Sequence, residues 1–121
     1  MLRLVGVGVG VEEFQWSEDE QVWPFEKAND GSTLYCKEVD CGAGPNNGYS
    51  YTNHGIANIG ENYFNSYAYG RDPALNDAVP LPHNLAMFSH WVSGANVVVW
   101  STINYSHVSP VIARIFYTKN N

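Results

Sequence analysis

Near the end of the chain stands Val111-Ile112-Ala113-Arg114-Ile115-Phe116-Tyr117-Thr118, whose side chains fall into two alternating rows. Successive residues of a β-strand point to opposite faces, so each row belongs to one face. The first row is apolar and is predicted to face a core: Val111, Ala113, Ile115 and Tyr117. The second row contains Ile112 and Phe116 and is not polar enough for open solvent. This stretch therefore predicts a strand that needs a cover on its second face as well.

Six further stretches upstream carry strand signals, and turn-forming residues separate them. These stretches are 34–40, 49–54, 63–69, 78–81, 86–92 and 96–103. Ser93-Gly94-Ala95 predicts a tight hairpin turn, and no stretch shows a convincing helical period. The pattern predicts an all-β fold, an antiparallel, jelly-roll-like β-sandwich over residues 32–121. An extended N-terminal arm is expected to precede it over residues 1–31.

The arm differs in composition from the rest of the chain. It begins with a Val/Gly alternation, continues through an acidic stretch over 12–20 and ends in aromatic residues. Its apolar surface exceeds what a solvated linker needs, so we expect it to dock. Either it anchors the protein to a larger body, or it adds an edge strand to its own sheet. The anchor residues would be Val5, Val7, Val9, Val11, Phe14, Trp16, Trp23 and Phe25.

Charge and cysteine content narrow the function classes. Charged residues make up only 15% of the chain, so the surface is expected to be unusually neutral. The net charge of −6 would repel a phosphate backbone, and nucleic acid is not an expected partner. Cys36 and Cys41 lie five positions apart in one expected strand, which favours two free structural thiols over a disulfide.

The apolar start of the chain is too short for a membrane-spanning helix and contains three glycines. It also lacks a convincing signal-peptide cleavage region. We therefore expect a soluble chain that is made without export and is not inserted in a membrane.

Several short motifs follow one another in a fixed order. They are Leu34-Tyr35-Cys36-Lys37-Glu38-Val39-Asp40, Gly42-Ala43-Gly44-Pro45-Asn46-Asn47, His54-Gly55-Ile56-Ala57-Asn58-Ile59, Val79-Pro80-Leu81-Pro82, Asn96-Val97-Val98-Val99 and Tyr117-Thr118-Lys119. Together they resemble a β-sandwich module found at the C-termini of tail, fibre and appendage proteins of tailed phages. The resemblance covers about residues 31–119. Gly44 stands where that family usually has Leu.

The resemblance implies a non-enzymatic structural protein of a bacteriophage virion. A short arm stands where the family has a long fibre, and this favours a small head-fibre or decoration-type subunit that the arm pins to the capsid or tail. Such a protein would be located in the virion and contact other virion proteins. Its sandwich would serve surface attachment, either to host polysaccharide or as decoration. A free-standing carbohydrate-binding lectin module is the alternative.

The second row of residues 111–118 has two interpretations. Loops or the arm cover it, or it packs against sister subunits. Val98 and Trp100 would join this outer surface if Val97 and Val99 point inward. Because phage fibres and spikes are usually homotrimers, the resemblance favours a homo-oligomer and in particular a trimer. The interface residues would be Val98, Trp100, Ile112, Arg114 and Phe116.

A Tyr-rich stretch is the candidate for sugar binding. Flat aromatic rings beside planar amides suit stacking on sugar rings and reading of hydroxyl groups. The candidate residues are Tyr63, Asn65, Tyr67, Tyr69, Arg71 and Asp72. The same residues would also suit a plain strand with Tyr hydroxyls at its rim.

No motif predicts catalysis, a metal or a cofactor. The acidic residues cluster in the arm or scatter through loops, whereas glycoside hydrolysis needs two carboxylates across a cleft. The four histidines, His54, His83, His90 and His107, lack the spacing of metal ligands. We therefore expect neither an enzyme nor a bound cofactor.

Overall fold

The computed structural model describes residues 14–84 and 87–120. In that part the strands are β1 (Gln21–Val22), β2 (Tyr35–Asp40), β3 (Asn46–Asn53), β4 (Ile59–Asp72), β5 (Asp77–Leu81), β6 (Phe88–Ser93), β7 (Asn96–Asn104) and β8 (Val111–Lys119). The expected all-β fold is confirmed. Each stretch with a strand signal corresponds to one strand, and β1 is the strand that alternation did not reveal.

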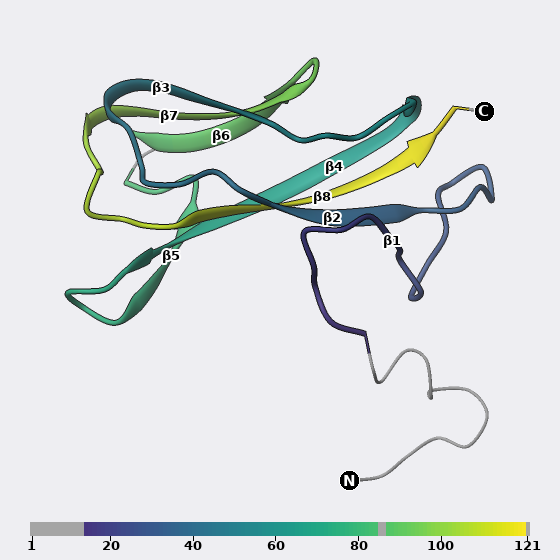
Figure 1. Cartoon of the computed structure of the whole chain (residues 1–121), viewed down its shortest axis with the longest axis horizontal. Coiled ribbons are helices and arrows are strands. Elements are labelled where there is room, and N and C mark those ends of the chain that lie inside the picture. The colour runs from purple at the N-terminus through teal and green to yellow at the C-terminus, as the bar shows by residue number, and fades with distance from the viewer. Residues whose placement is uncertain (1–13, 85–86, 121) are drawn as a thin grey trace, which may run out of the picture.

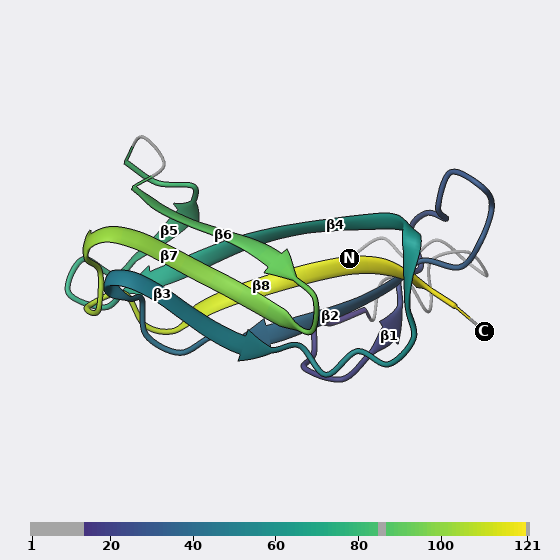
Figure 2. The same cartoon turned by 90° about the horizontal axis from the view of Figure 1, so that it is seen from above.

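The strands form two antiparallel sheets that pack face to face (Figure 1). The order is β1-β2-β8-β4-β5 in the larger sheet and β3-β7-β6 in the smaller one. Seen from above, the smaller sheet covers only part of the larger one (Figure 2). The chain crosses between the two sheets four times, from β2 to β3, from β3 to β4, from β5 to β6 and from β7 to β8. This path is jelly-roll-like.

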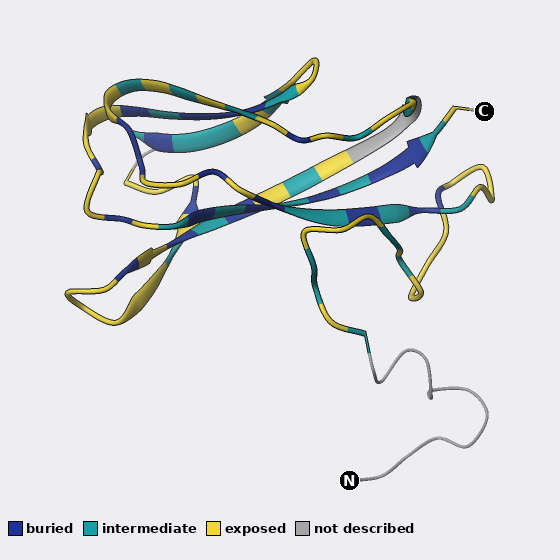
Figure 3. Ribbon diagram, in the orientation of Figure 1, coloured by how far each residue is buried: buried dark blue, intermediate teal, exposed yellow. Residues whose placement is uncertain are grey.

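Strand β8 lies near the middle of the larger sheet, between β2 and β4. Its inward row of Val111, Ala113, Ile115 and Tyr117 is fully buried, as the alternation predicts. The row contacts the inward side chains of the smaller sheet, above all Phe88, Val97 and Val99, which are buried as well (Figure 3). These two rows form the core of the sandwich.

The segment that leads into β1 runs on the side of the larger sheet that points away from the smaller sheet, and the loop from β1 to β2 projects beyond the end of the sandwich (Figure 1). Strand β1 pairs with β2, with Gln21 opposite Cys36 and Val22 opposite Tyr35. A further backbone hydrogen bond runs from the amide of Glu38 to the carbonyl of Ser17 at 2.8 Å. Of the two interpretations of the arm, the added edge strand is therefore the arrangement that these residues adopt. The Val/Gly alternation lies outside the described residues.

Both cysteines are free and buried, as expected. Burial raises the pKa of each thiol, Cys36 and Cys41, to about 11. At neutral pH they are therefore protonated, inert side chains that contribute to packing.

The structure explains why position 44 is a glycine. A Cβ atom there would overlap the carbonyl oxygen of Tyr105 and lie 3.2 Å from the ring of Phe88. The amide of Gly44 also donates to the carbonyl of Val108 at 2.8 Å, which holds the two loops together. This close approach leaves no room for the Leu that is usual in the phage module.

Candidate binding faces

The outer face of the larger sheet carries a cluster of aromatic side chains from the arm, and we call it the arm face. Phe116 lies at its centre, with ring centroids 5.4 Å from Trp16 and 5.0 Å from Trp23. Phe14 contacts both tryptophans edge-on, and Phe25 stacks at a tilt on Trp23. Each such aromatic pair contributes about 0.5–1.5 kcal/mol beyond the area it buries.

Arg114 lies in the same outer row of β8 as Phe116, and four side chains contact it. Its Nε donates to Glu38 at 2.8 Å, and its Nη1 donates to the hydroxyl of Tyr67 at 3.3 Å. The guanidinium lies over the rings of Trp16 and Tyr69, at 4.6 and 5.4 Å from their centroids. Burial acts to lower the Arg114 pKa, but the bonds to Tyr67 and Glu38 outweigh it and raise the pKa.

A polar latch joins the arm to the end of β8. Glu20 accepts a hydrogen bond from the hydroxyl of Tyr117 at 2.6 Å and one from Nζ of Lys119 at 2.8 Å. Burial acts to raise the pKa of Glu20, yet these bonds outweigh it and the pKa lies below its usual value. Burial, followed by the bond to Glu20, raises the pKa of Tyr117. The latch thus favours the ionised carboxylate and the neutral phenol.

The residues predicted for an oligomer interface are not brought together. Ile112, Arg114 and Phe116 belong to the arm face, whereas Val98 and Trp100 lie on the outer face of the smaller sheet, at the opposite side of the sandwich. Phe116 is covered by the arm of the same chain. Val98 is 1% exposed, although alternation correctly puts it on an outer face. The prediction of a single outer surface shared by these five residues is wrong, because β7 and β8 belong to different sheets.

The residues predicted as a virion anchor fall into two groups, four aromatic side chains and four valines. Trp16 and Trp23 pack on Phe116 of the larger sheet. Phe14 packs on both tryptophans, and Phe25 packs on Phe14 and Trp23 but remains 51% exposed. Val5, Val7, Val9 and Val11 lie outside the described residues.

The residues predicted to bind sugar belong to β4. Asn65, Tyr67 and Tyr69 share the arm face with β8 through the pairs Asn65–Phe116, Tyr67–Arg114 and Tyr69–Ile112. Tyr67 is 43% exposed, but its hydroxyl accepts from Arg114. Arg71 is exposed, whereas Asp72 is buried and caps a turn by accepting from the amide of Ala74 at 3.1 Å. Asp72 is therefore not available to a ligand, and the side chain of Tyr63 lies outside the described part.

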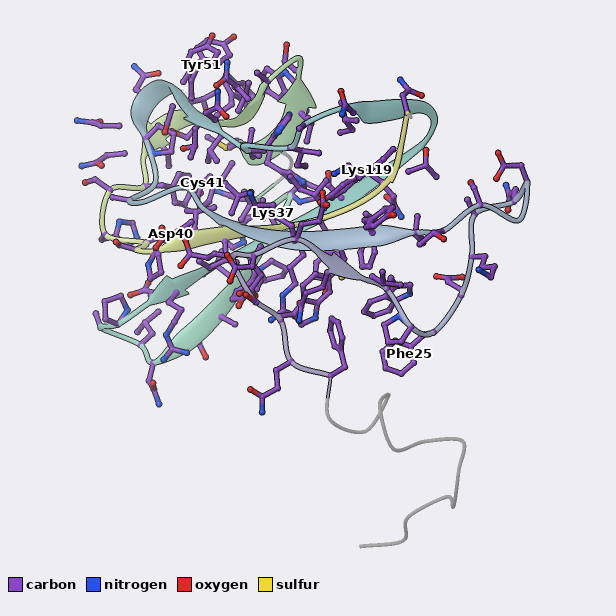
Figure 4. The ribbon with its side chains drawn as sticks, turned by 45° about the vertical axis from the view of Figure 1, so that its right-hand side comes forward. Phe25, Lys37, Asp40, Cys41, Tyr51 and Lys119 are labelled. Atoms are coloured by element: carbon purple, nitrogen blue, oxygen red, sulfur yellow. The ribbon has the colours of Figure 1, made fainter. Side chains whose placement is uncertain are left out.

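A second surface, on the smaller sheet, was not predicted as a sugar site. We call it the aromatic face and define it by Tyr49, Tyr51, Trp91, Val98 and Trp100. The register Tyr51–Val98–Trp91 places three of them in one row across the strands, and Tyr49 is opposite Trp100 in the next row. Figure 4 shows Tyr51 on the side of the molecule opposite to Phe25 of the arm.

The rings of the aromatic face are unusually open. Tyr49 is 58% exposed, Tyr51 65% and Trp91 42%. The ring centroid of Tyr49 lies 6.4 Å from that of Tyr51 and 5.9 Å from that of Trp91. Val98 is buried because it lies between Tyr51 and Trp91. The face therefore forms a continuous apolar platform, and exposed patches of this kind mark binding sites.

The sequence contains a signal for this face. Residues 41–60 and 78–113 contain no Asp, Glu, Lys or Arg, and together they supply all three strands of the smaller sheet. Tyr49 and Tyr51 lie two positions apart in the first of these stretches, so they share one face of a strand, and Trp91 lies in the second stretch. Read together, the absence of charge and the alternating rings could have located the face.

Charged side chains gather instead in a groove of about 270 Å³ at the edge of the sandwich, between β2 and the end of β3. Its lining residues are Glu18, Lys37, Glu38, Val39, Asp40, Thr52, Asn53 and His54. Figure 4 shows Lys37 and Asp40 at the level of β2, away from Tyr51. In the described part of the chain, no group of three or more His, Cys, Asp or Glu side chains is arranged to hold a metal ion.

One Ser–His pair lies between the sheets. A hydrogen bond of 3.1 Å joins the hydroxyl of Ser66 and Nε2 of His90. The buried Nδ1 of His90 has no partner among the described residues, so no third group orients the imidazole as it does in a catalytic triad. Burial lowers the pKa of His90. The pair connects β4 to β6 inside the sandwich.

Comparisons with known proteins add no relative. No protein-family model matches the chain, no curated protein matches it, and no solved structure matches it. Over residues 14–84 and 87–120, the structure contains no helix long and apolar enough to cross a membrane. The candidate surfaces of this chain are therefore argued from its own geometry.

Proposed function

We propose that the chain is a non-enzymatic structural protein of a bacteriophage virion, of the fibre or decoration type. It displays the β-sandwich for attachment to glycans on the host surface. The observation that carries the attachment role is the aromatic face, whose three open rings lie on a sheet without charged residues. The ordered motifs over residues 31–119 support the virion role.

The same surface supports a second candidate, a free-standing lectin module. Both candidates use the aromatic face, and they differ in what the N-terminal segment does. In the virion proposal, the Val/Gly alternation over residues 5–11 attaches the chain to the capsid or tail. A homo-oligomer, with a trimer favoured by the resemblance, would use a surface other than Phe116, since the arm of the same chain covers Phe116.

The virion role is tested by incorporation of an epitope-tagged chain into particles. The deletion must end before Phe14, because residues 14–25 pack on the sheet. A chain without residues 1–13 is expected to keep its thermal stability and to lose incorporation, while the full chain is recovered with the purified particles. Equal incorporation of both forms contradicts the anchor, and the absence of the full chain from particles favours the lectin.

A further inference from the structure

We infer that the aromatic face binds a neutral sugar chain, one without carboxylate, sulfate or phosphate groups. This inference rests on the proposed attachment function and deepens it, because it names the ligand class and the residues. The residues expected to stack on sugar rings are Tyr49, Tyr51 and Trp91, with Trp100 beside them.

The first argument is the solvent exposure of the aromatic rings. An aromatic side chain on a free surface normally has its body covered, yet Tyr51 and Tyr49 are 65% and 58% exposed. The apolar faces of sugar rings suit such flat surfaces, because their C–H groups stack on the negative face of an aromatic ring. Tyr49 contacts both Tyr51 and Trp91, so one sugar chain could span the three rings.

The second argument is the polar border of the face. Asn96 lies between Asn53 and Ser93 in the register, one pleat beyond the row of Tyr51, Val98 and Trp91. At the other end, Ser89 lies opposite Trp100. Planar amides and hydroxyls both donate and accept hydrogen bonds, which matches the hydroxyl groups around a sugar ring.

The third argument is charge. No residue of β3, β6 or β7 is Asp, Glu, Lys or Arg. An acidic glycan would be recognised by Arg or Lys, which are the side chains that pair with carboxylate and phosphate. A neutral glycan needs no such charged partner, and the Asn and Ser side chains at the border of the face suit its hydroxyl groups.

The inference is tested by affinity electrophoresis of the full chain in native gels that contain one dissolved polysaccharide each. The neutral probes are galactomannan, dextran and hydroxyethyl cellulose, and the acidic probes are alginate and polygalacturonate. We expect retardation in at least one neutral gel and none beyond the blank in the acidic gels. Because no ion pair is involved, binding is expected to be unchanged between about 50 and about 500 mM salt.

Matched variants locate the site. Tyr51→Ala and Trp91→Ala are each expected to weaken binding at least roughly tenfold, as removal of a central aromatic anchor does. Tyr67→Ala is the control, since Tyr67 is an exposed tyrosine on the arm face. Circular dichroism spectra of the three variants check that each is folded.

Three results of the gel experiments overturn the inference. They are retardation only in the acidic gels, loss of binding in Tyr67→Ala but not in Tyr51→Ala, and no retardation in any gel. A native mass that falls from oligomer to monomer in Tyr51→Ala would assign the face to a second copy of the chain and overturn it as well. Failure in the gels leaves the incorporation test of the virion role unaffected, so the two failures are distinguishable.

Discussion

At the scale of single residues, Gly44 is fixed by the loop that crosses it. A methyl group would collide with the backbone of Tyr105, which cannot move independently of the core. Gly44→Ala is expected to destabilise the fold by about 1–3 kcal/mol, the usual cost of overpacking. Gly48→Ala is the control, because nothing lies within 4 Å of its Cβ position. Urea denaturation of both variants checks the prediction, and equal midpoints would contradict it.

His90 gives the fold a dependence on pH. Because burial lowers its pKa, the unfolded chain takes up a proton at higher pH than the folded chain. The stability held by neutral His90 is therefore complete above about pH 6.5 and is lost as the pH falls from there through the lowered pKa.

The fall in melting temperature between about pH 7.5 and about pH 5 should therefore be smaller in His90→Gln than in the unmodified chain. His83→Gln, which changes an exposed imidazole, should keep the full fall. If the His90→Gln profile runs parallel to that of the unmodified chain, His90 does not cause the pH dependence.

At the scale of elements, the arm and β8 stabilise each other through Phe116. Phe116→Ala removes the ring on which Trp16 and Trp23 pack, so we expect a loss of about 2–4 kcal/mol from the free energy of unfolding. Tyr51→Ala removes a ring of similar size from an open face, where it covers Val98, and should cost clearly less, about 1 kcal/mol. Chemical denaturation of the pair decides this, and similar losses would mean that the arm does not stabilise the sheet.

The latch at Glu20 is the polar part of the same contact. Glu20→Ala leaves the buried hydroxyl of Tyr117 without its acceptor, and we expect a cost of about 1–3 kcal/mol. In the Tyr117→Phe background the same change should cost less, because no hydroxyl is stranded. Since the pKa of Glu20 is lowered, its stabilisation is complete above the ordinary carboxyl pKa and is lost as the pH falls through the lowered value. A double-mutant cycle without coupling would rule the latch out.

The strands were predictable because each depends on local alternation and on nearby turn residues. Tyr117 and Ile115 could be assigned to the core from residues 111–118 alone. The sequence left open whether the arm or a sister subunit covers the outer row, since the deciding contact joins residues 100 positions apart, where Trp16 meets Phe116. Val98 shows the same limit: alternation gives its face, but its burial comes from Tyr51 and Trp91 on neighbouring strands.

At the scale of the whole molecule, the two outer faces differ in kind. The arm face is partly covered by the chain's own arm and carries the ion pair of Arg114 and Glu38, whereas the aromatic face lies on strands without Asp, Glu, Lys or Arg. The aromatic face is therefore available for the proposed attachment to glycans without displacement of residues 14–25.

Two truncations test this division of the molecule. Removal of residues 1–13 should leave the sandwich as stable as the full chain, because the aromatic cluster begins at Phe14. Removal of residues 1–25 takes away β1 and the cluster, and it should expose Phe116 together with Cys36, which lies between Gln21 and Phe116 in the register. Alkylation of thiols under native conditions is the measurement, with Cys41 as the internal control, since it lies in the core.

We expect Cys36 to be protected in the full chain and in the shorter truncation, and to react in the longer one while Cys41 stays protected. The longer truncation should also associate, because it exposes the apolar row that the arm covers, and native mass spectrometry would detect the larger species. If Cys36 reacts equally in all three forms, the arm does not close this face in solution, and the outer row of β8 becomes available again for contact between subunits.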